Sequence, residues 1–179
     1  MDTITLAVPS IEKLPQYVNA LKCGWSPNTT RDVSGEQLAL YGQGPEVLLT
    51  ELTRQDGTIL QADGQRTPRL PSRVFWIWDG AFCGAINLRF VPGSEDLPPH
   101  VSGHVGYAVV PWKERRGYAT RALAMVLPVA REVGLVRVLV TCDEDNAASR
   151  RVILANGGVQ VEAQPHEPTK LRFWIDTTP

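Results

Sequence analysis

Residues 109–120 constrain the fold more than any other part of the chain, because they contain the end of a strand, a glycine turn and the start of a helix. The apolar pair Val109-Val110 stops at Pro111, which cannot continue a hydrogen-bond ladder. Gly117 then permits a tight backbone turn, and apolar residues from Ala119 onward recur at helical spacing. The turn therefore lies at the positive end of a helix dipole, where backbone N–H groups lack partners within the helix. An anion such as phosphate is the ligand that this arrangement favours.

Basic residues cluster around the same turn, although the chain as a whole is almost neutral. The formal net charge is −1, and acidic and basic residues are mixed along the sequence. This mixing excludes an extended basic face for nucleic acid. Positive charge is concentrated instead at Lys113, Arg115, Arg116 and Arg121. We therefore expect a discrete phosphate ligand rather than a polymer, the alternative being an ordinary solvated basic helix end.

The segments around the turn predict a fixed order of strands and helices. Residues 84–89 and 103–109 have the apolar, β-branched character of two strands before the turn, and residues 137–142 predict another strand after it. A capped helix follows, which begins near residues 143–146 and ends at Gly157-Gly158. A last strand is expected over 170–175. The order is strand, strand, loop, helix, strand, helix, strand.

This order, together with the turn, resembles the GNAT superfamily of acyl-CoA-dependent N-acetyltransferases. The pyrophosphate loop of that family has the pattern (Arg/Gln)-x-x-Gly-x-(Gly/Ala), and Gly117-Tyr118-Ala119 fits its second half. The first position falls on Glu114, so Arg115 or Arg116 would supply the missing cation. The resemblance covers residues 75–176, approximately, and implies an α/β (α+β) fold. The implied fold has a mixed, mostly antiparallel central sheet of about six or seven strands, flanked by helices, with splayed central strands.

The resemblance also implies acetyl-CoA as co-substrate, without a metal. Main-chain groups would do most of the binding, because the loop amides hold the diphosphate and a main-chain N–H near Val109 polarises the thioester carbonyl. Asn146 and Ser149 either cap their helix or hydrogen-bond the pantetheine arm, and the two roles are compatible. The expected cofactor contacts are Val109, Val110, Arg115, Arg116, Gly117, Tyr118, Ala119, Thr120, Asn146 and Ser149.

Transfer of an acetyl group to an amine requires a polarised carbonyl, an uncharged amine and a proton for the departing thiolate. Many members of the resembled family place a Tyr seven residues beyond the Asn, but Ile153 occupies that position here. We therefore consider Tyr107, Ser149 and Cys142 as proton donors, or a thiolate that leaves unassisted.

The candidate general base is His104, which starts the strand leading to the loop and has a reference pKa of about 6.5. Its structural alternative is a partly buried histidine at a strand end. Glu95 and Asp96, on the long connection over residues 91–102, are rival bases, and a water chain is a third route. Arg89 is the candidate for binding a carboxylate of the acceptor, with Arg172 in a similar position, unless both simply pair with surface acids.

Other features bound the organisation and location of the protein. A chain of 179 residues is long enough for one core and too short for two ordinary domains, so we expect a single GNAT-like acyltransferase domain over residues 1–179. Asp2 stands where a signal peptide needs a basic residue, and no run of about 18 apolar residues occurs. We therefore expect a cytoplasmic protein without membrane contact. No His or Cys pair has ligand spacing, which predicts the absence of a zinc site.

The sequence thus predicts an N-acetyltransferase that moves an acetyl group from acetyl-CoA to a primary amine by direct attack in a ternary complex. The expected acceptor is a small molecule or an amino-acid-like amine, while a protein N-terminus or lysine and a homodimer are left open. The alternative is a non-catalytic acyl-CoA-binding or sensing module, motivated by Glu114 and Ile153. A third class is a phosphate-binding protein that does not bind CoA.

Overall fold

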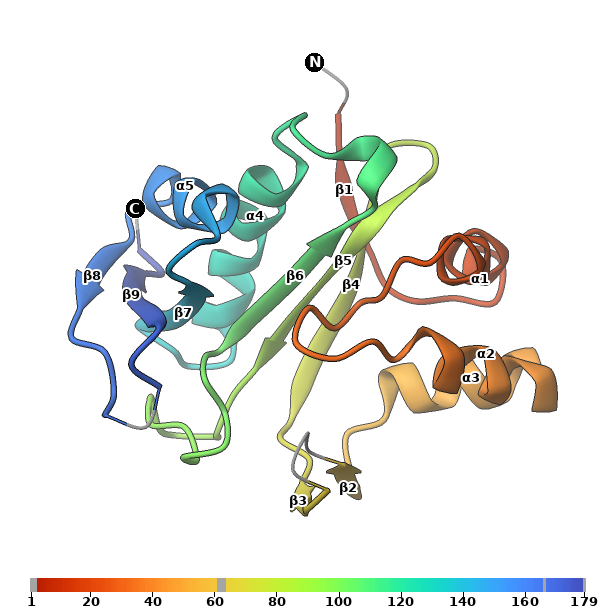
Figure 1. The fold of residues 1–179 in the computed structure, drawn as a ribbon, viewed down its shortest axis with the longest axis horizontal. Coiled ribbons are helices and arrows are strands. Elements are labelled where there is room, and N and C mark those ends of the chain that lie inside the picture. Colours follow the sequence, from red (N-terminus) through yellow and green to blue (C-terminus); the bar gives the residue numbers. More distant parts are fainter. Residues whose placement is uncertain (1–2, 61–63, 166, 179) are drawn as a thin grey trace.

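The structure is a computed structural model that describes residues 3–60, 64–165 and 167–178 (Figure 1). The strands are β1 (Thr5–Ala7), β2 (Thr58–Leu60), β3 (Arg66–Pro68), β4 (Ser72–Trp78), β5 (Phe82–Arg89), β6 (Val105–Val109), β7 (Arg137–Asp143), β8 (Val159–Val161) and β9 (Lys170–Asp176). The helices are α1 (Leu14–Lys22), α2 (Ser34–Gln43), α3 (Pro45–Thr53), the 3₁₀ turn η1 (Pro111–Lys113), α4 (Tyr118–Glu132) and α5 (Ala147–Ala155).

The described strands form two antiparallel sheets and a small ribbon. The first sheet has the order β1-β4-β5-β6, the second has the order β7-β9-β8, and β2 pairs with β3. The expected fold class, a mostly antiparallel α/β arrangement flanked by helices, is confirmed. The expected single sheet is divided between β6 and β7, which lie side by side in Figure 1 without a ladder joining them in the described part of the chain.

Helices cover both faces of this arrangement (Figure 1). Helix α4 packs against β5, β6 and β7 through the apolar positions that the sequence predicted, among them Ala122, Leu123 and Val126, which are fully buried. On the opposite face, Tyr17 of α1 stacks on Trp76 of β4 with ring centroids 5.1 Å apart. Val110 is fully buried in this second core. The buried side chain of Val110 therefore anchors the chain between the end of β6 and the glycine turn.

Prolines lie in or beside several of these elements. Residues 66–72 are rich in Pro and Arg, a composition that favours a loop, but β3 and the start of β4 lie there. Helix α1 begins at Leu14, and Pro15 occupies its first turn. Helix α4 continues through Pro128 without a break. No described helix combines the length and apolarity needed to cross a bilayer.

Candidate functional site

The glycine turn after β6 has the backbone conformation of an anion cradle. Arg115 (φ 59°) and Gly117 (φ 74°) both adopt left-handed conformations on either side of Arg116. Arg115 is the one non-glycine residue with positive φ in the described ranges. Left-handed residues in a turn can direct successive N–H groups toward one side, as in an anion-binding nest.

The first turn of α4 continues this cradle. Gly117 is the N-cap residue and no side chain of the described residues caps the helix, whose first internal hydrogen bond runs from Arg121 N–H to Gly117 O over 3.1 Å. The N–H groups of Ala119 and Thr120 precede that bond in the first turn, where backbone donors lack acceptors within the helix. A Cβ placed on Gly117 would meet nothing within 4 Å, so the space in front of the turn is open.

Basic side chains surround this open space. Arg115 and Arg116 are exposed. Arg121 lies closer to the backbone, because its guanidinium donates to Arg116 O over 3.3 Å and sits 5.0 Å from the centroid of the Tyr118 ring. Glu114, the departure from the family pattern, is exposed and has an extended backbone. The cradle thus combines backbone donors with a positive rim.

The edge of β6 that faces β7 carries unpaired backbone groups. Arg89 N–H donates to His104 O over 2.8 Å, and Val110 N–H donates to Cys83 O over 3.0 Å. In an antiparallel pair, hydrogen-bonded residues alternate with non-bonded ones. Between these two bonds, Val105, Tyr107 and Val109 are therefore the residues whose N–H groups point away from β5, toward the break in strand pairing beside β7 that is called the gap below.

A pair of hydroxyl groups crosses the same gap. Tyr107 of β6 and Ser149 of α5 approach to 2.7 Å between Oη and Oγ. Burial raises the pKa of Tyr107 to about 12, so its phenol keeps its proton at neutral pH. Asn146 caps α5, since its Oδ1 accepts the N–H of Ser149 over 2.9 Å. The structural role expected of Asn146 is thus observed, and its contact with a pantetheine arm stays a prediction.

His104 joins the two sheets at the closed end of the gap. The backbone N–H of His104 donates to Leu139 O over 2.8 Å, and its ring Nδ1 accepts the backbone N–H of Leu139 over 2.9 Å. Acceptance at Nδ1 leaves the ring proton on Nε2, which is buried without a partner among the described residues. Burial lowers the pKa of His104 to about 4, with Arg89 lowering it further and Glu95 opposing the shift. The ring is neutral at pH 7 and bridges β6 to β7, and its predicted role as general base stays a prediction.

Arg89 lies on the face of the first sheet opposite α4. Its side chain packs over Gly106, where an added Cβ would come within 2.9 Å of Nη2. Burial lowers the pKa of the guanidinium, and Nε is buried without a hydrogen-bond partner in the described part of the chain. A buried cation without a counter-ion is costly unless a ligand supplies the negative charge.

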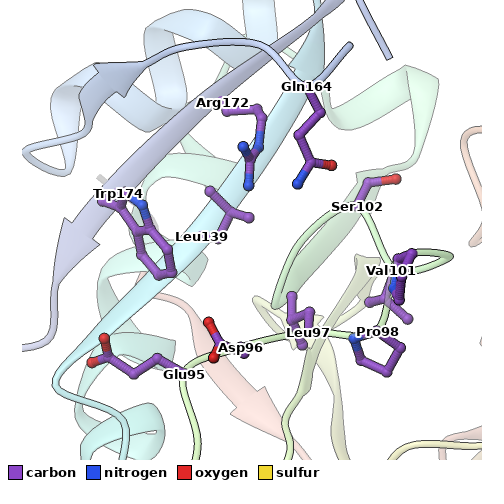
Figure 2. Close-up of a pocket in the computed structure, with 11 residues that line it drawn as sticks. Glu95, Asp96, Leu97, Pro98, Val101, Ser102, Leu139, Gln164, Arg172 and Trp174 are labelled. Carbon is purple, nitrogen blue, oxygen red and sulfur yellow. The ribbon is translucent and has the colours of Figure 1, made fainter. Parts of the chain in front are cut away.

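A cavity of about 110 Å³ lies nearby, between the second sheet and the connection over residues 91–102 (Figure 2). Leu139 forms its floor, and Figure 2 shows Arg172 and Gln164 on one side and Asp96 on the other. Among the described residues, no hydrogen bond or ion pair engages the side chain of Arg172 or of Asp96, whereas Glu95 pairs with Arg137 over 2.9 Å. The cavity therefore offers both signs of charge to a small ligand. No group of three or more His, Cys, Asp or Glu in the described ranges is placed to hold a metal ion.

Comparison with known proteins decides the family. The sequence model described as the acetyltransferase (GNAT) domain matches residues 47–159, which is more than half of the chain. The chain belongs to the GNAT acetyltransferase family. Enzymes of this family use acetyl-CoA as co-substrate, so the expected co-substrate is confirmed at the level of the family. No curated protein sequence matches the chain significantly.

Solved GNAT structures share its fold. RimJ of Mycobacterium smegmatis, in complex with CoA-disulfide, is 19% identical with a TM-score of 0.60, over 97% of this chain and 81% of that one. An acetyltransferase of Agrobacterium tumefaciens is 16% identical with a TM-score of 0.56, over 96% and 89%. The microcin C7 self-immunity acetyltransferase MccE, in complex with acetyl-CoA and AMP, is 12% identical with a TM-score of 0.59, over 97% and 92%. At these identities the likeness concerns the fold.

One departure from the family pattern, and one residue outside that pattern, bear on the site. Ile153, at the position where many members carry a Tyr, is fully buried in the core, so no donor can act from that position. The sequence analysis did not single out Asp79, which lies in the turn between β4 and β5. In the structure Asp79 binds Lys113 and Tyr118, on either side of the cradle. The sequence signal for this contact was weak, because an Asp-Gly pair between two strands is already explained by the turn.

Proposed function

We propose that this GNAT protein transfers the acetyl group of acetyl-CoA to a primary amine of a small or amino-acid-like acceptor, by direct attack in a ternary complex. The observation that carries the proposal is the continuity between the unpaired edge of β6 and the uncapped first turn of α4. Residues 110–117 connect the two, so one extended ligand can contact both. A ligand with a diphosphate at one end and a thioester at the other fits this arrangement.

In this proposal the cradle holds the diphosphate of acetyl-CoA. The amides from Arg115 to Thr120 donate to the phosphate oxygens, and the exposed side chains of Arg115 and Arg116 add charge. The pantetheine arm enters the gap between β6 and β7, beside Val110 and the Asn146 cap of α5. The N–H of Val109 then polarises the thioester carbonyl.

The pair Tyr107–Ser149 is our candidate for the proton donor. The amine nitrogen attacks the carbonyl carbon, the C–S bond breaks, and the electron pair of that bond leaves on sulfur. A hydroxyl of the pair donates a proton to the thiolate, while the nitrogen loses its extra proton to a base or to water. Tyr107→Phe should lower kcat about a hundredfold and leave the Kd of CoA within about twofold. A loss of CoA affinity without a change in kcat would contradict this role.

In this proposal the acceptor enters from the face of the first sheet opposite α4. Arg89 is the candidate for binding its carboxylate, because the guanidinium is buried and has no described counter-ion. The cavity lined by Arg172 and Asp96 suits an acceptor that carries both signs of charge. For the base, the side chain of Asp96 has no hydrogen bond among the described residues, whereas the Nδ1 lone pair of His104 is engaged by the N–H of Leu139. A water chain is the third candidate. His104 remains a testable candidate.

Turnover tests the proposal against its alternative, a non-catalytic acyl-CoA-binding module, which the burial of Ile153 favours. The experiment is a thermal-shift titration with acetyl-CoA, followed by detection of free CoA thiol with a panel of amines. A ligand at 100 times its Kd should stabilise the protein by about 2.7 kcal/mol. A shift with thiol release supports the enzyme, a shift without release by any amine supports the module, and the absence of a shift contradicts both.

A further inference from the structure

One buried carboxylate joins the two ends of the anion cradle. Asp79, in the turn between β4 and β5, has a side chain that is only 8% exposed. Lys113 Nζ lies 2.6 Å from its Oδ1 and 2.7 Å from its Oδ2, and the Tyr118 hydroxyl donates to Oδ2. The N–H of Ala81 donates to Oδ1 over 3.2 Å.

These partners have a particular place in the chain. Lys113 is the last residue of η1, and Tyr118 is the first residue of α4. The residues between them, 114–117, carry the left-handed conformations of the cradle. Tyr118 is itself buried, at 2% exposure, so its ring cannot shift without disturbing the core. The carboxylate therefore holds Lys113, which precedes the cradle, and Tyr118, which follows it, against the turn between β4 and β5.

The charge of Asp79 is well compensated in its buried position. Burial alone would raise the pKa of the carboxyl, but the hydrogen bonds from Lys113 and Tyr118 outweigh it and hold the pKa well below its ordinary value. The carboxylate is thus charged throughout the neutral pH range. Removal of one partner leaves a buried group unsatisfied, so the contact is not easily exchanged for water.

We infer that Asp79 is a positioning residue for acetyl-CoA binding, which fixes the cradle in its anion-binding conformation through Lys113 and Tyr118. This inference rests on the proposed function. Asp79 itself does not touch the diphosphate, because its oxygens face Lys113, Tyr118 and Ala81. Its effect is on the spacing of the loop amides, and hence on the part of acetyl-CoA that contains phosphate.

The test compares two ligands on the full-length protein. Coenzyme A contains the diphosphate, whereas S-acetylpantetheine lacks it but keeps the arm that would lie between β6 and β7. Isothermal titration gives the Kd of CoA, and ligand-observed NMR gives the weaker Kd of S-acetylpantetheine. We expect Asp79→Asn to weaken CoA at least tenfold and to change the Kd of S-acetylpantetheine less than twofold. Tyr118→Phe, which removes one hydroxyl, should weaken CoA about threefold.

Asp56→Asn is the matched control, because Asp56 pairs with Arg54 over 2.9 Å on an exposed surface away from the cradle. It should leave both dissociation constants unchanged. Equal CoA affinity of wild type and Asp79→Asn would overturn the inference, and so would parallel losses for both ligands. If Asp79→Asn does not fold, Tyr118→Phe decides by the same criteria. A wild-type protein that binds no CoA would instead refute the proposed function.

Discussion

At the residue scale, the cradle depends on the left-handed conformations of Arg115 and Gly117 and on the contact of Asp79 with Lys113 and Tyr118. Gly117 was expected to permit a tight turn, and it adopts φ 74° at the N-cap of α4. The left-handed conformation of Arg115 was not predictable, because an arginine carries no local preference for it. The contact of Asp79 with Lys113 and Tyr118 joins residues 34 and 39 positions apart. Such a contact depends on the packing of the hairpin against α4, which no local motif reports.

Substitution of Gly117 tests the cradle directly. Gly117→Asp should abolish measurable CoA binding, because the carboxylate would stand in the open space before the amides and repel the diphosphate. The backbone strain of a non-glycine residue at φ 74° adds about 1 kcal/mol of destabilisation. Isothermal titration with CoA measures the loss.

The control for this variant is Gly134→Asp. Gly134 also has a positive φ, 92°, with nothing within 4 Å of an added Cβ, but it follows the other end of α4. This variant should lose comparable stability and keep wild-type CoA affinity. Comparable CoA affinities of the two variants would contradict the assignment of the cradle.

The buried state of His104 predicts a pH dependence of stability. Its pKa is about 4 in the folded protein and about 6.5 in the unfolded chain. Between these values the unfolded state takes up a proton that the folded state does not, so the free energy of unfolding falls as the pH falls from 6.5 toward 4. The slope of this contribution is at most about 1.4 kcal/mol per pH unit. Urea unfolding of wild type and His104→Gln across this range measures it.

The two histidine variants should differ in that experiment. His104→Gln removes the titrating ring and should flatten the slope, whereas His100→Gln changes an exposed histidine and should keep the wild-type slope. An undiminished slope in His104→Gln would mean that the ring titrates normally. That result would restore His104 as a base with a pKa near neutrality.

At the element scale, periodicity and glycine signals located most of the elements around the site. The strands over residues 84–89 and 137–142 and the helix beginning at Ala119 correspond to β5, β7 and α4 within a few residues. The short strands β3 and β8 were not predicted, because three residues are too few to show an alternating pattern. The separation of β6 from β7 followed from the family resemblance, since neither strand is unusual in composition.

The pairing of β5 with β6 depends on one glycine. Gly84 has φ 147°, and a Cβ at this position would come within 2.2 Å of Ala108 O and 2.8 Å of Val109 Cα. Gly84→Ala should therefore push β6 out of register at the residues that carry the unpaired edge, and destabilise the protein by about 2–3 kcal/mol. Gly35→Ala is the matched control, because Gly35 lies in α2 with nothing within 4 Å of an added Cβ. It should stabilise the protein by up to about 1 kcal/mol.

Urea unfolding of both alanine variants measures these effects. A Gly84→Ala variant as stable as Gly35→Ala would show that β5 and β6 can separate at this position without cost. The close approach of the two strands would then not be required for the site.

At the scale of the whole molecule, the protein consists of two sheets held together by α4, by α5 and by the His104–Leu139 contact at one end of the gap. The sequence predicted most strands of the two sheets but not how the sheets pack together, because the packing of α4 across both sheets depends on long-range contacts. A ligand that enters the gap would contact β6 along the edge that lacks a strand partner. The binding of acetyl-CoA should thus complete the hydrogen bonding of the molecule.

Residue-resolved hydrogen exchange tests this completion, because neighbouring amides of β6 and its end face opposite directions. The N–H of Val110 is bound to Cys83 O and should exchange slowly with or without ligand. The N–H of Val109 points into the gap and should exchange rapidly in the free protein, then at least tenfold more slowly with saturating acetyl-CoA. Free CoA, which lacks the acetyl carbonyl, should protect Val109 less than acetyl-CoA while protecting the loop amides equally. Equal protection of Val109 by the two ligands would mean that this N–H does not bind the thioester carbonyl, and the polarising role would have to pass to another group on the edge of β6.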